Sequence, residues 1–267
     1  MASVVMIFSG KGGAGKSFVA SNLACGFEML QKRTLLIDFA FGIRSDASIL
    51  GLTDSVLFNI GDVMRGECKL DEAVIRSEKD YVPDFLASSV NEPDADYDLK
   101  KSVRKIIKEI SNEYDFIIFD CTSCIGAEFD ACCSVADILL AITGEDAFSV
   151  GNTALRIAKA EAQLPARKYL ILNKIVITNG ETDDICAEDI IDEIGLPLIG
   201  IVPEDEYALK SMISSDPLIR YSTPAGIALE NVCRRIMGEC VPYKTYKKPK
   251  SIFEKNKLIL KNKQGGY

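Results

Sequence analysis

A glycine-rich loop between an apolar segment and a helix-type segment most limits how this chain can fold. The loop is Gly10-Lys11-Gly12-Gly13-Ala14-Gly15-Lys16-Ser17, which fits the pattern G-x-x-x-x-G-K-[ST]. Residues 4–8 before it form a short β-branched apolar run typical of a buried strand, and residues 18–30 after it have apolar residues at helical spacing. A strand, a glycine turn and a helix in this order predict an α/β fold.

The loop also has the chemistry of an anion site. Glycines let backbone N–H groups point inward, and the helix N-terminus adds the positive end of its dipole. In this pattern Lys16 is expected to reach the β- and γ-phosphates, and the Ser17 hydroxyl to ligate Mg²⁺. The alternative is a glycine turn that binds nothing, but the flanking strand and helix favour a nucleotide site.

Strand-type and helix-type segments alternate along the rest of the chain. Further strands are expected at residues 34–38, 81–87, 114–120, 137–143, 168–173 and 198–202, and helices at residues 59–65, 99–111, 150–162, 187–194, 204–214 and 224–237. Residues 39–46 are expected to form a loop. This order predicts a doubly wound, mostly parallel sheet of about seven to eight strands with helices on both faces.

Two of the expected strands end on a carboxylate. Asp38 ends the strand at residues 34–38, and Asp120 ends the strand at residues 114–120. Ligands of open parallel sheets bind outside the carboxyl ends of the strands, so Asp38 is expected to face the phosphates. Asp120 is expected to hold Mg²⁺ through water, opposite Ser17. An acidic strand cap without a ligand is the alternative for Asp120.

Composition excludes several classes of chemistry. The chain has no histidine, which removes Ser-His and Cys-His catalysis and imidazole-bound zinc. Its nine cysteines are an odd number scattered through apolar segments, as expected for reduced thiols in a cytoplasmic protein. No run of eighteen apolar residues and no export signal is found, so membrane spans and secretion are not expected.

Charge divides the chain into an acidic body and a basic tail. Residues 244–267 carry eight lysines and one glutamate, so residues 1–243 hold a net charge of −15 against −8 for the whole chain. We expect residues 1–243 to form one domain that does not bind DNA broadly. Residues 251–261 can form a short basic amphipathic helix suited to an anionic membrane surface, although a disordered tail is an alternative.

Lys11, a second lysine directly after the first glycine of the loop, is the residue that distinguishes this loop from an ordinary P-loop. With it, the loop resembles the Lys-Gly-Gly-x-Gly-Lys-[Ser/Thr] signature of the MinD/ParA family of deviant Walker-A P-loop ATPases. The stretch Asp38-Phe39-x-x-Gly42-x-Arg44 is similar to switch I of the MinD branch, and Gly200–Asp205 is similar to its segment against the adenine. Asn173 lies where related ATPases place an asparagine on the base.

The resemblance implies ATP and Mg²⁺ as ligands and an ATP-sandwiched homodimer in which Lys11 crosses to the partner. It implies catalytic roles for Lys11, Lys16 and Asp38 and metal roles for Ser17 and for Asp120 through water. The implied nucleotide-binding residues are Gly10, Lys11, Gly12, Gly13, Ala14, Gly15, Lys16, Ser17, Phe18, Asn173, Pro203, Glu204 and Asp205.

For function, the resemblance implies an ATP hydrolase that acts as a switch. Such a protein lies at the inner face of the cell membrane, held peripherally by its tail. It positions the septum-site machinery of cell division with a regulator protein as partner, and no sequence-specific nucleic acid is expected.

Two departures from the family pattern bear on hydrolysis. Ala40 stands where MinD-like proteins carry a second switch-I aspartate, and Cys124 stands where a switch-II glycine amide would face the γ-phosphate. An alanine cannot position water or a metal shell. We therefore expect ATP to be bound and hydrolysed slowly.

Other functions remain open on the sequence. Cys121 and Cys124 form a C-x-x-C near Cys132 and Cys133, which allows a metal-cluster or metal-carrier ATPase of the nitrogenase iron-protein type. Small core thiols are the plainer interpretation of these cysteines. A ParA-type partition switch and a flagellar-number regulator are further alternatives within the same family.

Overall fold

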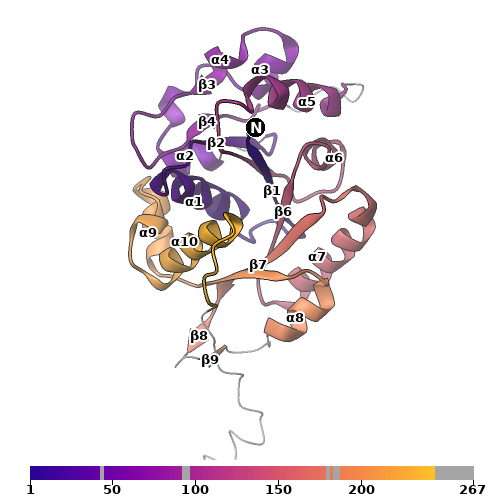
Figure 1. The fold of residues 1–267 in the computed structure, drawn as a ribbon, viewed down its shortest axis with the longest axis vertical. Coiled ribbons are helices and arrows are strands. Elements are labelled where there is room, and N and C mark those ends of the chain that lie inside the picture. Colours follow the sequence, from indigo (N-terminus) through magenta and orange to yellow (C-terminus); the bar gives the residue numbers. More distant parts are fainter. Residues whose placement is uncertain (43–44, 92–96, 179–180, 183–186, 244–267) are drawn as a thin grey trace, which may run out of the picture.

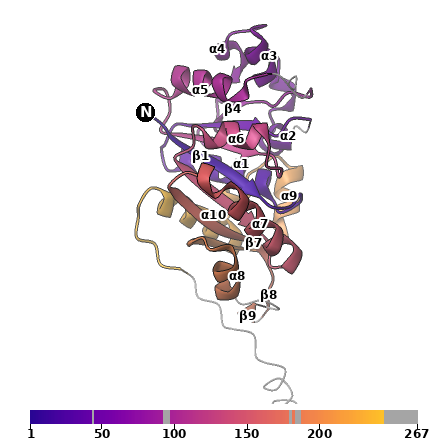
Figure 2. The ribbon, with the colours of Figure 1, turned by 90° about the vertical axis from the view of Figure 1, so that its right-hand side faces the viewer.

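The chain folds into one twisted sheet covered by helices on both faces (Figures 1 and 2). The computed structural model describes residues 1–42, 45–91, 97–178, 181–182 and 187–243. Arg44 of the expected switch I, Cys186 and the whole basic tail, residues 244–267, lie outside the described residues. Within the described residues, no helix is long and apolar enough to span a bilayer.

Eight strands form the main sheet in the order β10-β7-β6-β1-β5-β2-β4-β3. They are β1 Ser3–Ser9, β2 Thr34–Phe39, β3 Val74–Ile75, β4 Asp84–Leu86, β5 Phe116–Cys121, β6 Ile138–Thr143, β7 Arg167–Ile175 and β10 Leu198–Pro203. All neighbours pair in parallel except β3 with β4. A separate two-stranded hairpin is formed by β8 Ile177–Thr178 and β9 Glu181–Thr182. The predicted doubly wound, mostly parallel fold is confirmed.

Ten α-helices are described, six of four to eight residues and four of twelve to fourteen residues. They are α1 Lys16–Met29, α2 Ser45–Leu50, α3 Ile60–Arg65, α4 Leu70–Ala73, α5 Leu99–Ile110, α6 Ala127–Cys133, α7 Ala147–Ala160, α8 Ala187–Ile194, α9 Tyr207–Ile213 and α10 Pro224–Ile236. Short 3₁₀ turns occur at Thr53–Ser55, Glu161–Gln163 and Leu218–Arg220.

The central strand β1 shows why helices cover both faces. Its apolar side chains alternate between two cores: Val4, Met6 and Phe8 pack into one, and Val5 and Ile7 into the other. The first core includes buried residues of α5, α6, α7 and α8, and the second those of α1, α2 and α10. A strand that is apolar at every position must be covered on both sides, and this arrangement satisfies that requirement.

Some expected element limits were wrong, each for a local reason. Residues 39–46 were expected to be a loop, but α2 begins at Ser45. The strand expected at residues 81–87 is reduced to Asp84–Leu86, because Pro83 has no N–H to donate and Val82 N bonds Lys79 O in a turn. The helix expected from Glu204 begins at Tyr207, since Glu204 N still bonds Ile175 O.

Candidate nucleotide-binding site

The glycine loop joins the carboxyl end of β1 to the first turn of α1. Gly13 and Gly15 adopt positive φ angles of 81° and 91°, a backbone region that favours glycine. Gly15 immediately precedes α1, and no side chain caps the helix there. The first N–H groups of a helix have no intrahelical acceptor, so this uncapped N-terminus offers donors to an anion.

Gly10, the first glycine of the loop, lies against the helix α7. Its N–H donates to Thr153 Oγ1 at 3.3 Å. A Cβ at this position would lie 2.4 Å from Thr153 N in the α7 backbone, whereas a Cβ at Gly12 would meet nothing within 4 Å. The loop is therefore packed closely on α7 at its start and is open in its middle.

A cavity of about 460 Å³ extends from the loop to the carboxyl ends of β7 and β10. Nine of the expected nucleotide-binding residues line it: Gly13, Gly15, Lys16, Ser17, Phe18, Asn173, Pro203, Glu204 and Asp205. The expected residues Gly10, Lys11, Gly12 and Ala14 are not among its lining residues. At one end of the cavity lie Lys16 and the backbone of the glycine loop. At the other end lies the segment at the end of β10, Pro203 to Asp205.

The cavity also contains residues that sequence reasoning did not assign. The apolar side chains of Ala208, Leu209 and Met212 come from α9, and Ile49 comes from α2. α9 was expected as a helix, but nothing in its spacing indicated that it closes a pocket. α2 was not expected at all. These side chains give the end of the cavity distant from the loop an apolar wall.

Asn173 and Lys174, at the end of β7, hold the glycine loop itself. Asn173 Nδ2 donates to Ala14 O at 2.8 Å, and Lys174 Nζ donates to Gly13 O at 3.0 Å. Asn173 is buried. The family resemblance implies an asparagine on the base here, and the structure shows its amide Nδ2 bonded to the carbonyl of Ala14 in the phosphate loop.

Lys16 points from α1 toward the loop that follows β5. Its Nζ donates to Ser123 Oγ at 2.9 Å. Arg156 on α7 donates to Ser123 O. Ser123 was not predicted as a site residue, and its only signal in the sequence was its place just after Asp120. Ser123, in the loop after β5 that corresponds to switch II, therefore connects Lys16 of the glycine loop with Arg156 of α7.

Lys11 turns away from the cavity, toward the N-terminus of α7. Its Nζ lies 3.5 Å from Asp146 Oδ1 and 5.5 Å from the centre of the Phe148 ring. The side chains of Lys11 and Asp146 are 44% and 53% exposed, so this ion pair is weak and open to exchange. Asp146 also accepts from Ser149 N and Ser149 Oγ, which lowers the pKa of its carboxyl group.

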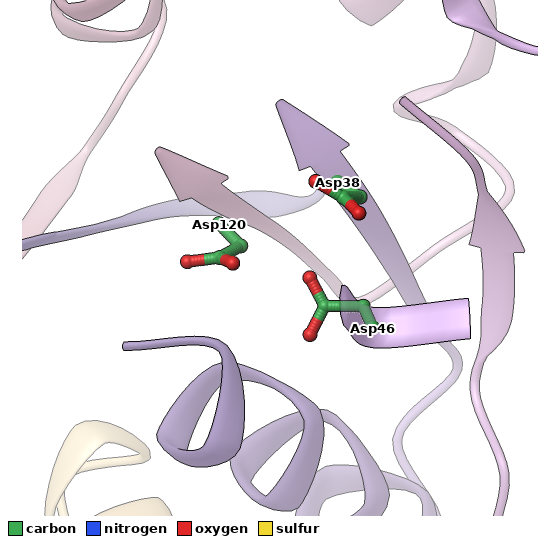
Figure 3. Close-up of side chains that lie close together, drawn as sticks. All are labelled: Asp38, Asp46 and Asp120. Carbon is green, nitrogen blue, oxygen red and sulfur yellow. The ribbon is translucent and has the colours of Figure 1, made fainter. Parts of the chain in front are cut away.

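Three buried carboxylates meet at the carboxyl ends of β2 and β5. Asp38 and Asp120 are register partners on these strands, and Asp46 comes from the first turn of α2 (Figure 3). One oxygen from each lies within 4.8 Å of the others. Ser17 Oγ donates to Asp120 Oδ2 at 2.5 Å. The structure thus brings the two expected metal residues, Ser17 and Asp120, into direct contact, and it adds Asp46, which was not predicted.

Burial and mutual repulsion disfavour ionisation in this cluster. Loss of hydration raises the pKa of Asp46 well above its usual range, and the nearby charges of Asp120 and Asp38 raise it further. Burial also raises the pKa of Asp120, against the lowering effects of Lys16 and Ser17. Asp46 Oδ2 and Asp120 Oδ1 are buried and accept from no N–H or hydroxyl group of the described residues, although a proton can be shared between Asp46 and Asp120. Oxygen-rich groups of this kind suit Mg²⁺, so the residues present fit the cation that the loop motif predicts.

Comparison with known proteins places this geometry in a family. Residues 2–161 match a family model described as an AAA domain. The septum site-determining protein MinD of Helicobacter pylori is 32% identical over 97% of this chain and 99% of its own length. The chain belongs to the MinD/ParA family of P-loop ATPases.

Other MinD proteins agree with this assignment. MinD of Bacillus subtilis is 28% identical over 91% of each chain. A solved structure described as the MinC:MinD cell division protein complex of Aquifex aeolicus superposes with a TM-score of 0.81 at 29% identity. The superposition covers 93% of this chain and all of the Aquifex aeolicus chain.

The two departures from the MinD/ParA pattern can now be placed. Ala40 follows β2, and its backbone N donates to Asp38 Oδ1 at 3.2 Å. The methyl group of Ala40 can neither ligate a metal nor accept a proton. Cys124 is exposed, and its N–H donates to Thr122 Oγ1 at 3.1 Å. The amide expected to face a γ-phosphate is therefore engaged inside the switch loop.

The C-x-x-C pair is split between two environments. Cys121 is buried at the end of β5, whereas Cys124 is exposed on the following loop. Among the described residues, the group that brings three ligand atoms together is the carboxylate cluster, and it contains no cysteine. Burial raises the pKa of Cys133 to about 12, so its thiol stays protonated at neutral pH. These observations favour small core thiols for the buried members.

Close packing of Gly10 on α7 leads to a matched pair of variants. Gly10→Ala should lower the free energy of unfolding by about 1–3 kcal/mol, because the new Cβ overlaps the α7 backbone. Gly12→Ala, where a Cβ meets open space, should change it by less than about 1 kcal/mol. Urea unfolding of the ligand-free protein measures both. Equal destabilisation by the two variants would contradict the packing shown here.

Proposed function

We propose that this chain is an ATP-dependent dimerising switch ATPase of the MinD type, which attaches to a membrane and positions cell-division machinery. The observation that carries the proposal is the pair of lysines in the glycine loop. Lys16 faces the cavity of its own chain, whereas Lys11 points out of it. Two lysines directed to two different sites suit a nucleotide shared by two subunits.

The nucleotide would lie along the cavity, with its phosphates on the glycine loop. Backbone N–H groups at the start of α1 and the Lys16 ammonium group would bind the phosphates. The base would lie at the other end, among Pro203, Asp205 and the apolar side chains of α9. Asp205 Oδ2 is buried there without a donor, and the exocyclic amine of adenine is a donor of the required kind.

Ser17 and Asp120 would hold Mg²⁺, the latter through water. When bound, the cation supplies positive charge beside the phosphates and so offsets the charge that develops on them during transfer. Lys16 would leave Ser123 Oγ for the γ-phosphate, because an ammonium group binds an anion more strongly than a hydroxyl. Departure of Lys16 would free Ser123, and through the Arg156 bond the change would reach α7.

Dimerisation would use the surface around Lys11. Phe148 and Leu155, seven residues apart on one side of α7, are 68% and 53% exposed. Ile125 on the switch loop is also exposed. Exposed apolar side chains on α7, whose N-terminus pairs with Lys11, suit contact with a second copy. In that contact Lys11 would exchange Asp146 for the partner's γ-phosphate.

Hydrolysis is proposed to be slow because Ala40 supplies no carboxylate beside Asp38. The bound ATP state, and with it the dimer, would then persist. A long-lived dimer suits a switch, since the output depends on which nucleotide is bound rather than on the amount hydrolysed.

Membrane attachment is proposed to depend on dimerisation. One basic amphipathic tail contributes about 1 kcal/mol per lysine near an anionic surface, partly offset by the cost of ordering the tail. Two tails on one dimer bind together at a raised effective concentration. The Aquifex aeolicus relative is described in complex with MinC, so a cell-division regulator protein is the proposed partner here.

The dimer is tested by substituting Lys11. Wild type should sediment as a monomer with Mg-ADP and as a dimer with Mg-ATP, and Lys11→Ala should remain a monomer with both. Lys108→Ala, an exposed lysine on α5, is the control and should behave as wild type. A monomer of wild type at saturating Mg-ATP would refute the switch.

The hydrolysis proposal is tested by restoring the carboxylate. Ala40→Asp should raise the steady-state ATPase rate by about 10²–10³, the usual effect of one preorganised group. Ala40→Asn, of the same size without the charge, should stay near the wild-type rate. Equal rates for wild type and Ala40→Asp would show that Ala40 does not limit turnover.

The membrane proposal is tested by liposome sedimentation. Liposomes that contain anionic lipid should bring down the full chain with ATP more than with ADP, and liposomes of neutral lipid should not. A chain ending at Tyr243 should stay in solution with either nucleotide. Recovery that is independent of nucleotide would separate membrane binding from the switch.

A further inference from the structure

Asp46 is a buried carboxylate to which the motif assigns no role. It lies in the first turn of α2, and its side chain is fully buried. Asp46 Oδ1 accepts from Ser21 Oγ at 2.6 Å. Ser21 is four residues after Ser17 on α1, so both hydroxyls lie on the same side of that helix. The bond to Ser21 thus holds Asp46 on the side of α1 that carries Ser17.

Ser21 accounts for only one of the two oxygens of Asp46. The other, Oδ2, is buried and accepts from no N–H or hydroxyl group of the described residues. Without a cation, a proton shared between Asp46 and Asp120 is the hydrogen bond open to it. A residue that only fastened α2 to α1 would need one acceptor, and a serine or asparagine would provide it. Burying a carboxylate oxygen is costly unless it is paired, so Oδ2 needs either a proton shared with Asp120 or a cation.

The neighbours of Asp46 show where that group belongs. Asp120, which already accepts from Ser17 Oγ, has its own Oδ1 buried without a donor. Ligand oxygens of Asp46, Asp120 and Asp38 lie within 4.8 Å of one another (Figure 3). Carboxylates this close repel when ionised. A divalent cation among them would offset the repulsion. It would also give Asp46 Oδ2 and Asp120 Oδ1 a positive partner.

We propose that Asp46 is a third carboxylate of the divalent-cation site, acting through Oδ2 on the cation or on a water bound to it. Ala40 removes one carboxylate from the segment after β2, and α2 returns one to the same region from six residues further along. Asp46 is a positioning residue for the cation. The inference rests on the proposed function in one respect: the cation is expected to arrive with the nucleotide.

The variant Asp46→Asn isolates the missing charge. Its Oδ1 can still accept from Ser21, and its size is unchanged. The affinity for a fluorescent ADP analogue is measured in EDTA and at graded Mg²⁺, and Mn²⁺ binding to the ADP complex is followed by EPR. The variant should need about 10–100-fold more Mg²⁺ or Mn²⁺ than wild type, as for other groups that support a metal. In EDTA its nucleotide affinity should equal or exceed that of wild type.

Asp54→Asn is the control for net charge, because Asp54 is exposed on the 3₁₀ turn that follows α2. It should leave the cation midpoint unchanged. Thermal unfolding in EDTA verifies that each variant is folded. Asp46→Ser, which suits a helix start, is used if the asparagine variant does not fold, and the same shift is expected.

An unchanged cation midpoint in a folded Asp46 variant would overturn the inference and leave the proposed function intact. Absence of nucleotide binding by the wild type, with and without Mg²⁺, would instead refute the proposed function. A loss of nucleotide affinity that is equal in EDTA and in Mg²⁺ would mean that Asp46 only supports the loop, and it would also overturn the inference.

Discussion

Parallel pairing of β1 between β5 and β6 is the constraint on which the site depends. The register sets Ile7 beside Asp120 and Asp38 beside Asp120, so the carboxyl ends of β1, β2 and β5 lie at one edge of the sheet. At this edge the chain leaves β1 in the glycine loop and enters α1. Ser17 and Asp120, 103 residues apart in sequence, meet as a result. A slip of one residue would turn every side chain on a strand to the other face and would separate them.

The site places groups that are unfavourable for the ligand-free fold in positions that a ligand can use. Three buried carboxylates lie together, the N-terminus of α1 has no side-chain cap, and Asp205 keeps a buried oxygen without a donor. Each is costly on its own. Together they suit a ligand that is anionic at the loop, carries a cation beside the carboxylates, and offers a donor near Asp205. Mg-ATP, the proposed ligand, has these three properties.

The loop after β5 and the surface around Lys11 that is proposed for dimerisation are connected through α7. Gly10 bonds Thr153, Arg156 holds the Ser123 carbonyl, and Asp146 pairs with Lys11. These contacts place one face of α7 along the glycine loop and the switch loop at once. A rearrangement at Ser123 therefore need not cross the core to alter the surface that carries Phe148. A short connection of this kind is what the proposed nucleotide-dependent dimer requires.

Sequence alone determined the elements and the chemistry that depend on short stretches of chain. The apolar run of β1, the glycine pattern and the carboxylates Asp38 and Asp120 at strand ends are local features, and the period of apolar residues follows directly from strand and helix geometry. The contacts between segments that are distant in sequence were decided by the tertiary structure. Asp46 joins the carboxylates because α2 packs on α1, where Ser21 donates to it. Asn173 reaches the Ala14 carbonyl from β7, and Ser123 accepts from Lys16. No local spacing encodes these contacts, because each depends on how the sheet orders its strands and on which helix packs beside them.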